Sequence, residues 1–164
     1  MSDTLTATYD RKTRTYTAHA PGGLVLAGRT RQEVELAYLD AVAPAIARKV
    51  RTVAERWPAL ADRARRAGLL VVAQAVRPGR GLVAEARPWH PTVWFQETAQ
   101  VRGSGYAEDR AGRVVGRDWY SVTVHGDGYR CNCLDWQEGS APAAGDSLGR
   151  VCKHILAATL SGLY

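Results

Sequence analysis

All three cysteines of the chain lie in one short stretch that also holds a histidine. Cys131 and Cys133 are separated by one residue, eighteen residues follow, and Cys152 and His154 are again separated by one residue. Three thiolates and one imidazole form a ligand set for a tetrahedral Zn²⁺ ion. The alternative is that the cysteines are buried free thiols that pack as small apolar side chains. Their confinement to a single C-x-C…C-x-H array favours zinc, with these four residues as its ligands.

The spacing of the four residues predicts how each pair is held. Alternate residues of a strand point to one face, so a strand over residues 129–133 presents Cys131 and Cys133 on the same side. On a regular helix, side chains two residues apart point about 200° away from each other. Cys152 is therefore expected in the turn before a helix, and His154 in its first turn. Four protein ligands leave no open coordination position, so we predict a structural site and no catalytic one.

The flanking residues complete a ββα module around these ligands. Residues 119–124 and 129–133 are predicted strands, joined by a hairpin turn at residues 125–128 with Asp-Gly at its centre. The helix after Cys152 would pack its apolar face on this hairpin. That face is formed by Ile155, Leu156, Leu160 and Leu163.

The N-terminal part has the pattern of a small sheet followed by helices. Residues 5–9 and 14–20 alternate and are rich in strand-forming side chains, and residues 24–27 form a short third strand. Thr30 and Glu33 fit a capping box at the start of a helix. Helical periodicity continues to Val53, although Pro44 predicts either a kink or two helices that meet near Ala43.

The second half of this region is predicted as a further helix and a strand. Pro58 suits a first helical position, and Gly68 is the expected helix stop. Residues 69–76 are read as an apolar strand buried on both faces. Residues 77–81, R-P-G-R-G, are turn-rich and charged, so they are the expected boundary.

These patterns predict an α+β chain of two domains. The first, residues 1–78, is a ββα(β) unit. The second, residues 79–164, is an antiparallel sheet that contains the zinc-clamped module, with strands at residues 82–86 and 92–101 and loops at 103–105 and 108–117. No apolar run is long enough to cross a membrane, and no signal peptide is visible at the N-terminus, so a cytoplasmic protein is expected.

The net charge of +6 comes almost entirely from arginine, with nineteen Arg and three Lys. Four of the five tryptophans lie between residues 89 and 136 and alternate with arginines, a pattern used to hold single-stranded nucleic acid. A small core built from large side chains, and cations that only offset the charge of the metal site, explain the same residues without a nucleic acid. The candidate nucleic-acid contacts are Arg87, Trp89, Arg113, Arg117, Arg130, Trp136, Arg150 and Lys153.

Two resemblances add to this reading. The array C-x-C-x(18)-C-x-H, with Tyr129 before it and Ile155-Leu156-Ala157 behind it, looks like the SWIM zinc-finger family over residues 119–163. The resemblance implies a zinc-stabilised ββα module that binds DNA or proteins, often beside helicase-like or transposase-like domains. Residues 5–46 resemble a HicB-type antitoxin core through Tyr9, Tyr16, Pro21-Gly22 and Gly28-Arg29-Thr30, which implies a binding scaffold without a chemistry of its own.

The sequence contains none of the common catalytic motifs. It has no G-x-x-x-x-G-K-[ST] phosphate-binding loop, no G-x-S-x-G turn and no H-E-x-x-H pair. We therefore predict a non-catalytic DNA-binding protein. The alternative is an adaptor that docks on a DNA-processing protein, such as a helicase or a recombination factor.

Overall fold

The computed structural model describes residues 5–86, 91–103, 107–108, 114–115, 118–125, 128–137 and 150–163. For residues 81–86, 91–97, 107–108, 114–115 and 125 it describes the backbone only. The chain divides into two compact units, Met1–Ala75 and Val76–Tyr164. Both are mixtures of helices and antiparallel strands, so the predicted α+β class is confirmed. No helix in the described part of the chain is long and apolar enough to cross a membrane.

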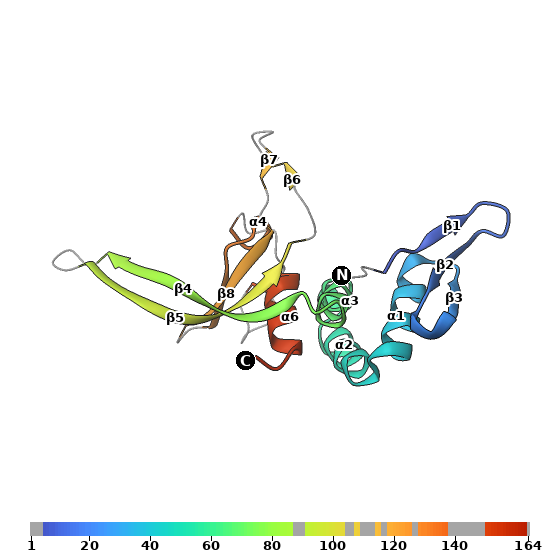
Figure 1. Cartoon of the computed structure of the whole chain (residues 1–164), viewed down its shortest axis with the longest axis horizontal. Helices are drawn as coiled ribbons and strands as arrows, with labels where there is room; N and C mark the ends of the chain where they lie inside the picture. Colours follow the sequence, from blue (N-terminus) through green and yellow to red (C-terminus); the bar gives the residue numbers. More distant parts are fainter. Residues whose placement is uncertain are drawn as a thin grey trace. The chain divides into compact units, whose positions relative to one another are not determined.

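The N-terminal unit begins with a three-stranded antiparallel sheet, in the order β1-β2-β3 (Figure 1). Its strands are β1 (Thr8–Asp10), β2 (Thr15–His19) and β3 (Val25–Gly28). A short 3₁₀ turn, Pro21–Gly23, joins the last two, with Gly22 at a φ of 81° that favours glycine. The predicted hairpin and third strand are therefore present.

Three helices follow the sheet: α1 (Arg31–Val42), α2 (Pro44–Arg56) and α3 (Ala61–Val72). The capping box is confirmed, because the Thr30 hydroxyl accepts from the Glu33 amide and the Glu33 carboxylate accepts from the Thr30 amide. Pro44 is the first residue of α2, which settles the alternative in favour of two separate helices. Helix α1 packs on β2 and β3, and all three helices pack on one another.

The prediction for residues 68–76 is wrong in two respects. Gly68 does not end a helix, and residues 69–72 continue α3 where a strand was expected. A Cβ at Gly68 would lie 2.9 Å from a methyl of Val50 and 3.1 Å from one of Leu39. The glycine is there because α1, α2 and α3 approach closely at this point, a requirement that a sequence pattern does not reveal.

The C-terminal unit contains a four-stranded antiparallel sheet in the order β4-β5-β8-β9. Strands β4 (Val76–Ala86) and β5 (Pro91–Arg102) pair along their whole length, whereas β8 (Trp119–His125) pairs with β5 only from Ala99 to Arg102. The far part of the β4–β5 hairpin thus extends beyond the other strands of its unit (Figure 1). Strand β9 (Gly128–Cys131) and the helices α4 (Leu134–Gln137) and α6 (Lys153–Leu160) complete the unit.

Residues 77–81 do not form the expected turn, because they lie inside β4. Pro78 has no amide to donate, and an edge strand such as β4 is where a sheet tolerates proline. A Cβ at Gly79 would lie only 2.4 Å from the Gln100 side chain of β5, so glycine fits a close cross-strand approach. The expected loop at residues 108–117 also needs correction, because Ala107–Glu108 (β6) pairs with Val114–Val115 (β7).

Candidate metal centre

The three cysteines and the histidine predicted as ligands meet at one point of the C-terminal unit. Their ligand atoms all lie within 4.8 Å of one another, and the four residues are buried, with 0 to 4% of each exposed. Cys131 is the last residue of β9, Cys133 precedes α4, and Cys152 and His154 begin α6. Segments on either side of the eighteen-residue gap are therefore brought together around the cluster.

The first pair of ligands is held by the backbone around Asn132. The Asn132 side chain accepts from the Ser121 amide at 2.9 Å, and the Asn132 amide donates to the Ser121 carbonyl at 3.3 Å. The chain after Cys133 turns at once into α4, where the amides of Trp136 and Gln137 donate to the Cys133 carbonyl. The prediction that both cysteines lie in the strand is thus half right: β9 ends at Cys131, and Cys133 lies in the bend beyond it.

The second pair is arranged as its spacing predicts. Cys152 has extended backbone angles, φ −93° and ψ 168°, and its carbonyl accepts from the Leu156 amide in the first turn of α6. His154 is the second residue of that helix. The change from extended to helical backbone lets both side chains face the cluster, which a continuous helix does not allow. Helix α6 packs against β5, β8 and β9, although Leu163 lies beyond its end and is 39% exposed.

The His154 ring faces the sulfur atoms with one defined nitrogen. Its Nδ1 lies 3.9 Å from the Cys131 Sγ and 4.0 Å from the Cys152 Sγ. Around a zinc ion with ordinary bond lengths, ligand atoms are separated by roughly 3.6 to 3.8 Å. The cluster is therefore within a few tenths of an ångström of that geometry at these two edges, and the residues fit a tetrahedral metal ion.

One further contact orients the imidazole. The ring stacks on Tyr120 of β8, with 4.4 Å between the ring centroids. Its second nitrogen, Nε2, is buried and makes no hydrogen bond to the described residues. A metal bound at Nδ1 needs the lone pair of that nitrogen, which requires the proton of the neutral ring to be on Nε2.

The thiols strongly change one another's pKa values because they are buried side by side. A hydrogen bond with Cys133 is the main cause that raises the pKa of Cys131. The same bond, with a second from Cys152, lowers the pKa of the Cys133 thiol. The hydrogen bond with Cys131 lowers the pKa of Cys152, but the contact with Cys133 and burial outweigh it and raise that pKa to about 12. Without a metal, the cluster therefore holds one thiolate, at Cys133, and two protonated thiols.

Four of the candidate nucleic-acid contacts lie outside the described residues: Arg87, Trp89, Arg113 and Arg117. The other four flank the cluster. Arg130 and Arg150 are exposed, while Lys153 and Trp136 are partly buried. The indole nitrogen of Trp136 is buried without a hydrogen bond to the described residues, and the Trp136 amide supports Cys133, so this side chain belongs to the surroundings of the cluster.

Sequence reasoning missed two residues that position the ligands. Tyr120 could have been found from strand alternation, because Val122 pairs with Cys131 and Tyr120 lies two residues away on the same face of β8. Asn132 carried a weaker signal. It lies between Cys131 and Cys133 in the sequence, and alternation directs its side chain, which has an amide oxygen, away from the cluster. The cation–π contact between Arg77 and Trp119, at 3.8 Å, could not have been predicted from the sequence, since forty-one residues separate the partners.

Comparison with known families finds one match, which covers part of the C-terminal unit. A family model of the SWIM zinc finger matches residues 120–162, which include all four clustered residues. The match covers none of the N-terminal unit, so the resemblance of residues 5–46 to a HicB-type antitoxin core stays a prediction. No curated protein and no solved structure matches the chain. The family match and the buried Cys₃His cluster agree, and residues 120–162 are a SWIM zinc finger.

Proposed function

We propose that Cys131, Cys133, Cys152 and His154 bind one Zn²⁺ ion that stabilises the fold of the C-terminal unit. Thiolate sulfur and imidazole nitrogen are the ligands that zinc prefers, and four of them complete a tetrahedral sphere. The bound ion supplies the positive charge that the buried thiolates need. The four residues come from the end of β9, the bend after it and the start of α6, so a shared ion would tie these segments together.

We propose further that the chain is a non-catalytic nucleic-acid-binding protein. A closed Cys₃His set leaves no position for a water or substrate, which argues against zinc chemistry. The observation that carries the proposal is the net charge of +6 on a chain that contains a SWIM zinc finger. An excess of Arg and Lys attracts phosphate backbones, and binding of this kind releases condensed counterions.

Fluorescence anisotropy with labelled 20-base-pair DNA and its single strand tests this function. We expect binding at low salt that weakens steeply between roughly 50 and 200 mM salt, because each neutralised phosphate contributes to the slope. A mutant with Cys133→Ser serves to ask whether binding needs the folded zinc module. Absence of any binding by the wild-type chain at the lower salt concentration would remove the proposal.

A second candidate function is docking on a DNA-processing protein. It is favoured by the β4–β5 hairpin. Among the described residues, the second side of β5 is paired only from Ala99 to Arg102, so the remaining backbone of β5 offers an edge for strand addition. Binding through such an edge uses main-chain hydrogen bonds, so it would persist in salt that abolishes phosphate contacts. A salt-resistant complex with a helicase or recombination factor, without binding of the chain itself to DNA, would favour this function over the first.

A further inference from the structure

The positive charge of the chain is concentrated in one of its two units. Residues 1–75 contain twelve Arg and Lys against seven Asp and Glu, which gives a net charge of +5. Residues 76–164 contain ten against nine, a net charge of +1. The SWIM zinc finger therefore lies in a nearly neutral unit, and the electrostatic attraction for a polyanion comes from the N-terminal unit.

Several cations of the N-terminal unit are engaged in ion pairs within it. Arg65 binds both Glu35 and Asp62, Arg31 binds Glu35, and Arg66 binds Asp62. These pairs lie on α1 and α3. They neutralise the basic run Arg63-Ala64-Arg65-Arg66 in large part, so α3 is not the stronger candidate for an anion-binding surface.

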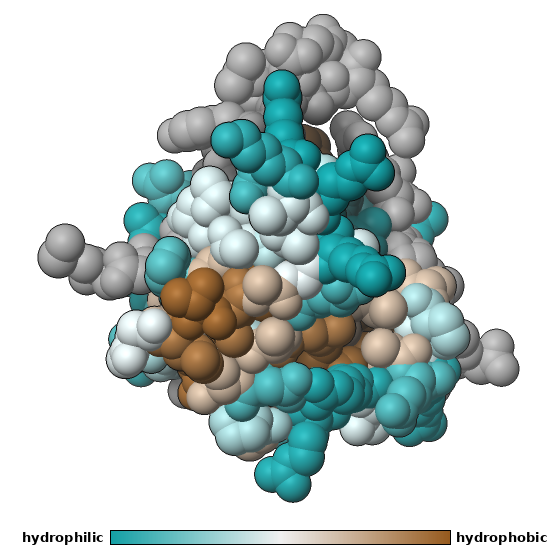
Figure 2. Space-filling view, turned by 90° about the vertical axis from the view of Figure 1, so that its right-hand side faces the viewer, coloured by the Kyte–Doolittle hydropathy of each residue, from teal (hydrophilic) through white to brown (hydrophobic). Residues whose placement is uncertain are grey.

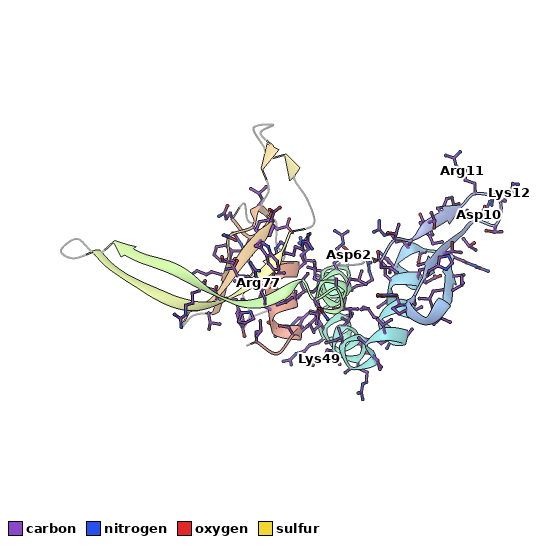
Figure 3. All side chains as sticks on the ribbon, in the orientation of Figure 1. Asp10, Arg11, Lys12, Lys49, Asp62 and Arg77 are labelled. Atoms are coloured by element: carbon purple, nitrogen blue, oxygen red, sulfur yellow. The ribbon has the colours of Figure 1, made fainter. Side chains whose placement is uncertain are left out.

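Helix α2 presents a different arrangement. Its inner face is formed by Ala47 and Val50, which are buried. Its outer face carries three cations, Thr52 and one acid, all exposed: Arg48, Lys49, Thr52, Glu55 and Arg56. Figure 3 shows Lys49 on this helix. Arg48, Thr52 and Arg56 follow one another at intervals of four residues, so they form a row about 12 Å long at 1.5 Å per residue.

Two contacts order this row and define its limit. The guanidinium of Arg56 lies 4.7 Å from the centre of the Trp57 ring, which reduces the freedom of its long side chain. Thr52 donates its hydroxyl to the Arg48 carbonyl. At one side of the row, Arg51 turns to Asp40 of α1 and also experiences the charge of Glu55. Arg51 thus forms an ion pair with α1 and serves as a control on the same helix.

We propose that the outer face of α2, with Arg48, Lys49 and Arg56, is the surface that contacts the phosphate backbone of nucleic acid. The inference rests on the nucleic-acid-binding function proposed above and assigns the contact to the N-terminal unit. The basic residues beside the zinc ligands, Arg130, Arg150 and Lys153, then act mainly on the charge of the metal site. Recognition through phosphates alone carries no base sequence, so this face positions the chain on any duplex.

The test compares two triple mutants that lose the same charge from different units. One carries Arg48→Gln, Lys49→Gln and Arg56→Gln, and the other carries Arg130→Gln, Arg150→Gln and Lys153→Gln. Binding to a labelled 20-base-pair duplex is measured by anisotropy at several salt concentrations. For three lost phosphate contacts, we expect the slope of log K against log salt to fall by about 2.7 in the α2 mutant, and by much less in the other.

Three controls keep the outcome interpretable. Circular dichroism and zinc content by native mass spectrometry confirm that each mutant is folded. A mutant with Arg48→Lys and Arg56→Lys retains the charge and is expected to keep the slope, and Arg51→Gln is expected to change it least among α2 cations. No binding by the wild-type chain would overturn the proposed function itself. Wild-type binding with an unchanged slope in the α2 mutant, or an equal or larger loss in the mutant of the zinc finger, would overturn the α2 assignment alone.

Discussion

The two units of the chain bury charge by different means. In the N-terminal unit, the carboxylate of Glu35 on α1 is only 4% exposed, and it is neutralised by Arg65 of α3, which is 7% exposed. In the C-terminal unit, three thiols and an imidazole are equally buried, and the basic neighbours Arg130 and Arg150 are exposed. The first buried charge finds its partner within the polypeptide. The second needs a cation from outside, which is why this unit is expected to depend on a metal.

The remaining core shows why the difference matters for stability. The N-terminal unit has an apolar centre that includes Val34 and Leu39 of α1, Val50 of α2, and Leu60 of the turn between α2 and α3. In the C-terminal unit, the buried apolar side chains of α6, with Val101 and Val122 of the sheet, lie next to the four-residue cluster. Without a metal, the centre of that unit would be a group of buried polar atoms with incomplete partners.

The N-terminal unit also exposes apolar and basic side chains. Leu24 and Val25 of the N-terminal unit are about half exposed at the start of β3. Figure 2 shows a brown apolar area bordered by teal hydrophilic side chains. Arg11 and Lys12 extend from the tip of the β1–β2 hairpin (Figure 3), which adds to the positive charge of this unit. The comparison thus separates a basic unit with a paired buried charge from a nearly neutral unit whose buried cluster we propose binds a metal.

The largest effect is expected from loss of a metal ligand. Cys133→Ser removes the thiolate that the other two thiols and the imidazole surround. Zinc binding in structural sites contributes about 10–16 kcal/mol of apparent free energy, so we expect the C-terminal unit to lose both its zinc and its fold. Native mass spectrometry gives the zinc content and circular dichroism the loss of structure. A mutant that keeps one zinc per chain would contradict the assignment of Cys133 as a ligand.

Breaking the buried ion pair tests the other side of the comparison. Glu35→Gln leaves the buried guanidinium of Arg65 without its main partner on α1. We expect the free energy of unfolding of the N-terminal unit to fall by about 3–5 kcal/mol. Urea denaturation, with hydrogen exchange of the amides of this unit as the probe, measures the change in its free energy of unfolding.

A matched double mutant sharpens this prediction. Replacing both partners by apolar residues, with Glu35→Leu and Arg65→Met, removes the buried charges together, and the cost is expected to be much smaller than for Glu35→Gln alone. Equal losses in the single and the double mutant would show that the packing of these side chains, and not their charge pairing, stabilises the unit.

The zinc affinity of the C-terminal unit is expected to depend on pH. The raised pKa values of Cys131 and Cys152 keep both thiols protonated at neutral pH when no metal is bound. The metal-free state therefore binds more protons than the zinc-bound state, and raising the pH favours zinc. With two protons released, the zinc affinity is expected to rise by roughly 100-fold per pH unit below the pKa values. Competition titrations with a chelating dye measure it, and an affinity independent of pH would contradict thiolate ligation.

A smaller effect is expected where the three helices meet. Gly68→Ala places a methyl group within 3.1 Å of Leu39 and closer still to Val50. We expect a loss of about 1–3 kcal/mol from overpacking. At an unobstructed helical position the same substitution stabilises by about 0.4–1 kcal/mol, so the sign of the change is decisive. Thermal unfolding compared with the wild type measures it, and a stabilised mutant would argue against the close approach of α2 and α3.

The parts of the fold that sequence predicts are those set by local patterns. The capping box at Thr30, the division of the helices at Pro44 and the placement of Cys152 before a helix all depend on a few neighbouring residues. The four ligands were found because their chemistry and spacing are unusual in any other context.

The errors arise where distant residues decide the structure. Gly68 reads as a helix stop, but its role is to admit Val50 and Leu39. Arg65 lies in a basic run of α3, and only the position of α1 shows that it forms a buried ion pair with Glu35. Gly79 was predicted to lie in a turn. Its close neighbour is the Gln100 side chain of β5, and the sequence around Gly79 does not show that the two strands pair there.

Hydrogen exchange with and without a zinc chelator tests the central claim most directly. If the metal replaces an internal counter-charge, chelation will remove amide protection from β8, β9 and α6 and leave α1, α2 and α3 as protected as before. Added zinc will restore the lost protection. Equal loss of protection in both units, or unchanged protection in the C-terminal unit after the metal has been removed, would contradict the account.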